Sequence, residues 1–447
     1  MVSAVEQMAA NTSWAALGKA TDLRNRILFT LGLLVVYRLG TFIPVPGIDG
    51  AALREFMEQA QGGIGGMLTM FTGGALGRMG IFALGIMPYI SASIIMQLMT
   101  SLSPSMAQLK KEGETGRKKI NQYTRYGTVV LTALQAYGIA AGLEGMTASG
   151  GQGVVLAGGM FFKASTVITL VGGTMFLMWL GEQITARGVG NGISLIIFAG
   201  IVAELPSALA ATLELGRTGA LSTLFIAALL IGAVGVIYGI VFVERSQRKL
   251  IVQYPKRQVG NKMFGGESSH LPLKINTSGV IPLIFASSIL LMPITLINFT
   301  ANSGPGFLTT VAAFLGRGQP AYLLMYATFI AFFAFFYTSV VFNPADTADN
   351  LKKYGGFIPG IRPGKNTADY LNYVLTRLTV VGAAYLVLIA ILPELLIARF
   401  SVPFFFGGTS LLIVVSVTLD TVAQVQSHLL AHQYEGLVKK SRLRGRR

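Results

Sequence analysis

Apolar runs, each about the length of a membrane span, alternate with polar segments along most of the chain. A helix needs about 20 predominantly apolar residues to cross the hydrocarbon core of a bilayer. The pattern therefore predicts an all-α, polytopic membrane protein with ten transmembrane helices. The predicted spans are residues 27–43, 80–102, 126–143, 164–181, 192–213, 220–243, 276–299, 319–342, 373–392 and 404–425.

Lys and Arg are distributed unevenly between the two sets of loops. Ten spans place both termini on one side of the membrane, where the segments hold 27 Lys and Arg against 5 in the opposite loops. Cytoplasmic loops carry an excess of basic residues, so we expect both termini in the cytoplasm. The net charge of +16 then reflects topology, and the low charged fraction of 12% agrees with a membrane protein.

Two segments depart from simple loops. Residues 62–77 (GGIGGMLTMFTGGALG) are external, apolar and glycine-rich, but too short to span. They are either a small hinged helix that enters and leaves on one face or an ordered loop lying on the membrane. Residues 344–368 are rich in Gly and Pro, which predicts an exposed cytoplasmic loop shaped by turns.

Two short motifs occur twice. GIMPYI at 85–90 matches GVIPLI at 279–284, and GISLII at 192–197 matches GTSLLI at 408–413. Each match is shifted by five spans, an odd number, so the paired helices run in opposite directions. This predicts an inverted repeat, whose working site lies near the membrane midplane between the halves.

The start of the chain has no short apolar core followed by a cleavage site, so we expect no cleaved signal peptide. The repeat divides the rest of the chain into two halves. The predicted parts are a cytoplasmic segment 1–26, a first five-helix half 27–213, a second half 220–425 and a basic cytoplasmic tail 426–447.

Isoleucines stand at matched places in the repeat, at positions 90, 197, 284 and 413. Ile86 and Ile193 lie four residues before two of them, on the same helix faces. They face a common central axis, or they are ordinary packing residues, as most buried isoleucines in a bundle are. Pro88 and Pro282 predict bends inside their spans, because a proline removes a helical hydrogen bond. In a membrane such a proline persists where neighbours or a cavity satisfy the freed carbonyl group.

The chain shows no catalytic motif. It has no cysteine and three histidines, and its glycine-rich runs fit neither a P-loop nor a dinucleotide fingerprint. We therefore expect no enzymatic activity and no cofactor or metal. Acidic residues are nearly absent from span centres, which argues against a coupled transporter, and no paired Asp, Ser–His or zinc motif supports an intramembrane protease. A pore lined by isoleucine could close by dewetting and widen for a large substrate.

Several long segments resemble the SecY family of bacterial protein-conducting channels, in the expected order. They are RMGIFALGIMPYISASIIMQL (78–98), KKEGETGRKKINQYTRYGT (110–128), MFLMWLGEQITARGVGNGIS (175–194), VFNPADTADNLKKYGGFIPGIRPG (341–364) and VPFFFGGTSLLIVVSV (402–417). The resemblance covers nearly the whole chain and is weakest at the N-terminus, around 144–162 and over 299–318.

The resemblance implies two inverted five-helix halves around a central hourglass pore. The implied pore ring is Ile86, Ile90, Ile193, Ile197, Ile284 and Ile413. The implied plug covers about 64–74 and includes Ile64, Met67, Leu68, Met70 and Phe71. A lateral gate between spans two–three and seven–eight would carry Gln97 and Asn276, and would release hydrophobic segments into membrane lipid.

The resemblance also implies partners. Cytoplasmic loops 244–275 and 343–372 would dock the translating ribosome or the motor ATPase SecA, and Arg362 matches a loop arginine that translocation needs. The implied docking residues are Arg248, Lys256, Arg257, Arg362 and Gly364. SecE and SecG would be membrane subunits, signal sequences and nascent polypeptides the substrates, and the bacterial inner membrane the location.

Overall fold

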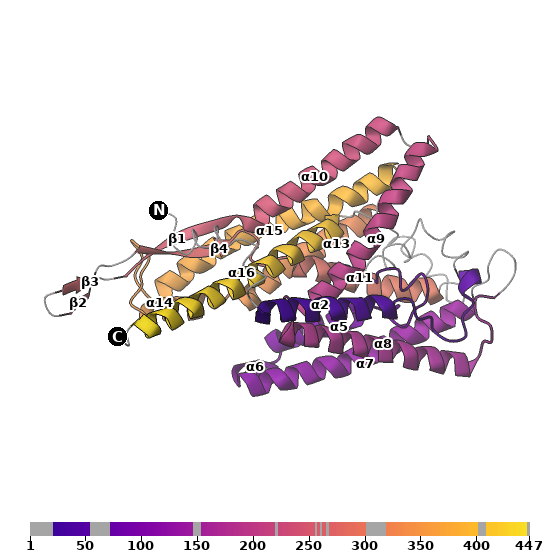
Figure 1. Cartoon of the computed structure of the whole chain (residues 1–447), viewed down its shortest axis with the longest axis horizontal. Coiled ribbons are helices and arrows are strands. Elements are labelled where there is room, and N and C mark those ends of the chain that lie inside the picture. Colours follow the sequence, from indigo (N-terminus) through magenta and orange to yellow (C-terminus); the bar gives the residue numbers. More distant parts are fainter. Residues whose placement is uncertain are drawn as a thin grey trace. The chain divides into compact units, whose positions relative to one another are not determined.

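The computed structural model describes residues 21–53, 72–145, 153–219, 222–254, 257–259, 262–264, 268–300, 319–400 and 408–444 (Figure 1). Helices occupy all ten predicted spans. They are α2 (Thr21–Gly40), α5 (Met87–Leu102), α7 (Glu114–Glu144), α8 (Met160–Arg187), α9 (Gly192–Arg217), α10 (Thr223–Arg245), α11 (Ile281–Thr300), α13 (Pro320–Val341), α15 (Lys365–Phe400) and α16 (Gly408–Arg444). Two shorter helices, α6 (Pro104–Lys111) and α14 (Pro344–Lys353), lie in loops.

Seven of these helices are long and apolar enough to cross a membrane when only the described residues are considered: α7, α8, α9, α10, α13, α15 and α16. Helix α5 has 16 residues, which at about 1.5 Å per residue is shorter than the hydrocarbon core. Its predicted start near residue 80 is wrong, because residues 81–86 form turns and the helix begins at Met87. At the other end of the chain, α16 continues through most of the predicted tail.

The two repeated prolines lie at helix starts. Pro88 and Pro282 are the second residues of α5 and α11. A proline in the first helical turn costs little, because the N–H that it lacks would have no intrahelical partner there. The predicted bends inside the spans are therefore wrong, and the prolines mark where each helix begins.

The loop after α10 contains strands that the sequence analysis did not predict. Strands β1 (Gln247–Gln253) and β4 (Ser268–Lys274) form an antiparallel pair, and β2 (Arg257–Val259) pairs with β3 (Lys262–Phe264) between them. Leu250 and Val252 are buried while their neighbours along β1 are exposed. This alternation of burial is typical of a half-buried strand, but Leu250, Ile251 and Val252 are all apolar, so the sequence itself does not show it.

The chain forms two compact units. The first takes its described residues from Met1–Ala210, Leu291–Gly316 and Val417–Arg447. In it, α7 packs along α8, α5 against α7, and α2 against α8 (Figure 1). One core cluster of this unit joins α7 and α8 to the turn before α5 and includes Met79, Ile139, Leu143, Phe162 and Leu170.

The second unit takes its described residues from Ala211–Leu290 and Arg317–Ser416. Helix α13 packs along α15, and α14 packs against α15 as well. Asn343 caps α14, because its side-chain oxygen accepts a hydrogen bond from the N–H of Ala345 at 3.1 Å.

Candidate functional site

Two glycines of the repeat introduce helices with the same backbone geometry. Gly85 has φ +56° and Gly279 has φ +62°, in the left-handed region that favours glycine. Each donates its N–H to the carbonyl oxygen three residues earlier, of Phe82 at 2.8 Å and of Asn276 at 3.3 Å. A helix begins two residues after each glycine. The first repeated motif therefore has one local structure at both of its sites.

The matched isoleucines occupy equivalent positions in their helices. Ile90 and Ile284 are the fourth residues of α5 and α11. Ile197 and Ile413 are the sixth residues of α9 and α16, and each of these helices begins at the glycine of the second motif.

Most of the six ring candidates are buried. Ile193 is half-buried, and the exposed fractions of the others are 4% for Ile86, 5% for Ile90, 4% for Ile197, 8% for Ile284 and 1% for Ile413. Residues of a closed ring and residues of an ordinary packing cluster are both buried. The equivalent helix positions, and not the burial, therefore support the ring assignment.

The turn before α5 is held by close backbone contacts. The N–H of Ile81 donates to the carbonyl oxygen of Ile43 at 2.9 Å. A Cβ on Gly173 of α8 would lie 2.0 Å from the carbonyl oxygen of Ile81, so only glycine lets α8 pack this closely on the turn. These contacts fix the position from which Ile86 and Ile90 extend.

Asn276, a predicted gate residue, is hydrogen-bonded through both its amide nitrogen and its amide oxygen inside the second unit. Its Nδ2 donates to Glu244 Oε1 at 2.8 Å and to the carbonyl oxygen of Gly279 at 3.1 Å. Its Oδ1 accepts from the hydroxyl of Ser278 at 3.0 Å. Asn276 is 2% exposed, so these bonds compensate its burial and stabilise the start of α11. The sequence analysis did not find the contact with Glu244.

Gln97, the other predicted gate residue, has a different environment. Its side chain is half-buried, and its Oε1 is buried without a hydrogen-bond partner among the described residues. A buried acceptor that lacks a partner costs about 1–3 kcal/mol. Gln97 is therefore poised to accept a hydrogen bond that the described residues do not supply.

The predicted plug residues lie outside the described part of the chain: Ile64, Met67, Leu68, Met70 and Phe71. The segment is described again from Thr72. There two guanidinium groups converge on one carbonyl oxygen, that of Gly73, from Arg38 at 2.6 Å and from Arg78 at 3.0 Å. Nothing in the sequence pattern pointed to this contact.

The two predicted docking loops pack into one structure. Gln253 at the end of β1 and Phe357 exchange two backbone hydrogen bonds, of 2.8 and 2.9 Å. A shared apolar core joins the loops to the start of α15: Leu250, Leu273, Ile358, Leu371, Val374 and Leu375. We call β1, β4, α14, the turn 355–364 and the first turns of α15 the two-loop module.

The predicted docking residues are distributed over this module. Arg248 is exposed on β1, and Arg362 is exposed on the turn 355–364. Gly364 has φ +106°, and the hydroxyl of Thr367 donates to the carbonyl oxygen of Arg362 at 3.0 Å, so the backbone at Arg362 is fixed. Arg257 begins β2, and Lys256 lies outside the described residues.

The stretch of sequence that holds the repeated helix starts and the two-loop module matches a known family. The pattern of the SecY family matches residues 80–422. This chain belongs to the SecY family. Among its relatives are the protein translocase subunits SecY of Rickettsia typhi and of Escherichia coli K12. The first is 57% identical over 425 residues, covering 95% of this chain and 98% of that relative. The second is 55% identical over 432 residues, covering 96% and 97%.

Solved structures of SecY and Sec61 channels share the fold. One described as a protein-conducting channel superposes with a TM-score of 0.64 at 19% identity, covering 90% of this chain and 91% of that one. Sec61 in a canine ribosome–channel complex superposes with a TM-score of 0.61 at 18% identity, covering the same shares. This SecY-family chain is therefore a multi-pass membrane protein with the fold of these channels, and the expected fold class and family are confirmed.

Proposed function

We propose that this SecY-family chain forms a channel through which unfolded polypeptide crosses the membrane, closed by its six ring isoleucines. The matched helix starts carry the proposal, because they give Ile90 and Ile284 the same position in two inverted repeats. Branched apolar side chains that meet in a narrow constriction exclude water and ions by dewetting. The same side chains can separate around an extended chain, since none of them is bonded to another.

Chloride efflux from vesicles tests this proposal. The chain is reconstituted with SecE and SecG, and Ile90→Ser and Ile284→Ser are compared with Ile90→Leu and Ile284→Leu. We expect the serine variants to leak, because a polar side chain stabilises water in the constriction, whereas the leucine variants stay closed. Equal efflux from serine and leucine variants would remove these isoleucines from the barrier.

Gln97 and Asn276 are proposed residues of a lateral gate through which hydrophobic segments enter the lipid. The Oε1 of Gln97 supports this role, because it has no hydrogen-bond partner among the described residues and a gate residue needs hydrogen-bonding capacity that is free in one state. Asn276 would take part only after exchanging its bonds to Glu244 and Ser278. Opening of the gate would therefore break an existing polar cluster in the second unit.

The two-loop module is the proposed docking surface for SecA or the translating ribosome. Its exposed guanidinium groups, such as that of Arg362, suit the phosphates of RNA and the carboxylate or carbonyl groups of a motor. Sec61 in a ribosome–channel complex has the same fold, which supports the ribosome as a partner. The energy for transport would come from these partners, so the chain itself is proposed to be neither an enzyme nor cofactor-dependent.

The proposed location is the bacterial inner membrane, with both termini in the cytoplasm. The excess of Lys and Arg on the side of the termini supports this orientation.

Residues 64–74 are proposed to act as the plug on the opposite side of the membrane.

A further inference from the structure

The loop between α8 and α9 is held by hydrogen bonds from several helices. We call residues 188–191 together with Gly192, the first residue of α9, the α9 entry loop, and it leads directly to Ile193. Backbone N–H groups in a buried loop, and those of the first helical turn, have no partner in regular structure and need an acceptor from elsewhere. The acceptors here are Thr30 Oγ1 for Val189 at 3.0 Å, Gln424 Oε1 for Gly190 at 2.9 Å, Thr185 Oγ1 for Gly192 at 2.9 Å and Asn191 Oδ1 for Ile193 at 3.1 Å.

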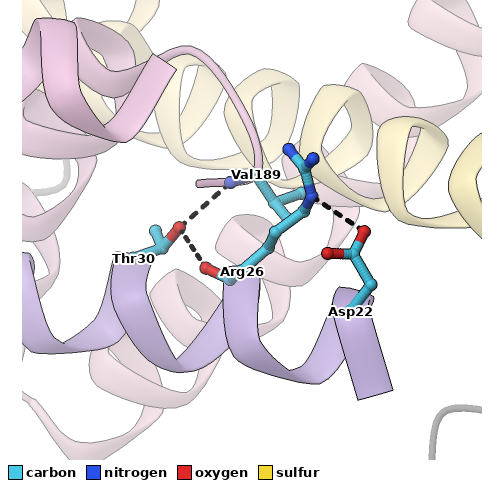
Figure 2. A network of polar contacts seen from close by, with 4 residues as sticks. All are labelled: Asp22, Arg26, Thr30 and Val189. Carbon is cyan, nitrogen blue, oxygen red and sulfur yellow. Dashed lines mark hydrogen bonds and ion pairs between the residues drawn. The ribbon is translucent and has the colours of Figure 1, made fainter. Parts of the chain in front are cut away.

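Thr30 anchors this loop to α2. Figure 2 shows its hydroxyl between two backbone groups: it accepts from the N–H of Val189 and donates to the carbonyl oxygen of Arg26 at 3.0 Å. A Cβ on Gly188 would lie 2.4 Å from Thr30 Oγ1, so the backbone passes directly over the hydroxyl. Thr30 is 7% exposed and Val189 is 3% exposed. Loss of this hydroxyl would leave a buried N–H without an acceptor.

Gln424 anchors the same loop to α16. Its Oε1 accepts from Gly190, whose φ of +91° turns the backbone toward α16. The apolar side chain of Val189 packs in a cluster with Leu23 of α2 and with Val425 and Leu429 of α16. Polar and apolar contacts thus bind the α9 entry loop to both helices.

The start of α9 also lies tightly against α8. A Cβ on Gly192 would lie 2.0 Å from the carbonyl oxygen of Gly181, and a Cβ on Gly181 would lie 3.2 Å from Cγ1 of Ile193. A shift of the α9 entry loop would therefore carry Ile193 and the first turn of α9 with it. Ile197 stands one turn further along the same face.

We propose that Thr30 and Gln424 are positioning residues for the channel, which hold Ile193 and Ile197 in the ring by fixing the α9 entry loop. The inference rests on the proposed function, since it takes the isoleucines to be the ring. A barrier made of apolar side chains needs each member held in place, because a small displacement opens a path for water. The two residues belong to helices that are distant in sequence, so the loop is fixed from two independent sides.

Crosslinking from single cysteines tests the inference, because the chain has no cysteine of its own. A secretory polypeptide with one cysteine is stalled in the complex with SecE and SecG, and disulfides are formed to a cysteine at Ile197 or at Ile90. We expect Thr30→Val to lower the yield of the crosslink at Ile197 about fivefold, which is the typical change in an equilibrium when one hydrogen bond is lost. The yield at Ile90 should not change, because α5 has no hydrogen bond to the α9 entry loop among the described residues. Thr30→Ser keeps the hydroxyl and should restore the yield.

Gln424 provides a second, independent variant. Its side chain is exposed, so Gln424→Met should fold even where Thr30→Val does not. We expect Gln424→Met to lower the Ile197 yield selectively, and Gln424→Glu, which keeps an acceptor oxygen, to preserve it. An unchanged ratio of Ile197 to Ile90 yields in Thr30→Val and Gln424→Met would overturn the inference while leaving the ring intact. No crosslink from either position in the parent chain would overturn the proposed ring itself.

Discussion

Arg362 stands on an exposed turn whose backbone is fixed on both sides. Gly360 and Gly364 have φ of +80° and +106°, and Thr367 donates to the carbonyl oxygen of Arg362. We expect Arg362→Glu to reduce SecA-driven secretion into vesicles at least about tenfold, because it replaces attraction to a docked partner with repulsion. Lys365→Glu is the matched control, since it makes the same charge change at an exposed position three residues away. Equal losses in both variants would assign the effect to net charge and not to Arg362.

Other single residues show where sequence reasoning ends. The equivalent helix positions of the matched isoleucines were predictable, because the repeated motifs are written in consecutive residues. Their assignment to a pore ring stays a prediction. Thr30 and Gln424 were not predictable, since the residues they bind lie 159 and 234 positions away in the chain. The contact of Asn276 with Glu244, 32 positions apart, was missed for the same reason. A hydrogen bond between distant segments leaves no local pattern.

At the scale of elements, helix positions were more predictable than helix starts. The hydrophobic pattern located the ten long helices among the described residues, but it placed the repeated prolines inside two of them. Apolar residues continue through the turn 81–86, so hydropathy could not separate turn from helix. The left-handed Gly85 lies near the end of this turn, and a glycine three residues before a proline was the local signal of the helix start.

The two-loop module provides a test at the same scale. Gln253 and Phe357 form an isolated antiparallel bridge with two hydrogen bonds, a pairing in which the Cα atoms lie about 5.5 Å apart. A disulfide fits this separation. We therefore expect Gln253→Cys with Phe357→Cys to crosslink on mild oxidation, as judged by the mobility of the oxidised chain on a gel.

Gln247→Cys with Phe357→Cys is the matched control for that pair, because Gln247 stands at the other end of β1. It should stay reduced. Equal oxidation of both pairs, or none of the first, would mean that the two loops do not form one module.

For the whole molecule, the distribution of charge and apolar residues predicted more than any local motif. We predicted a multi-pass membrane protein from the few charged residues, the long apolar runs and the excess of basic residues on alternate loops. Membership of the SecY family confirms that class. The strands in the loop after α10 were the main departure, because they stand outside the membrane, where hydropathy carries little information.

The central claim is that a moving polypeptide passes through the isoleucine ring. Single cysteines at Ile90, Ile284 and Ile413 test it, with a control at Ile231, which is 73% exposed on α10. A secretory chain with one cysteine is stalled midway through translocation and oxidised. We predict disulfides from the three ring positions and none from Ile231. Absence of all three in a complex that holds the stalled chain would show that the polypeptide takes another path.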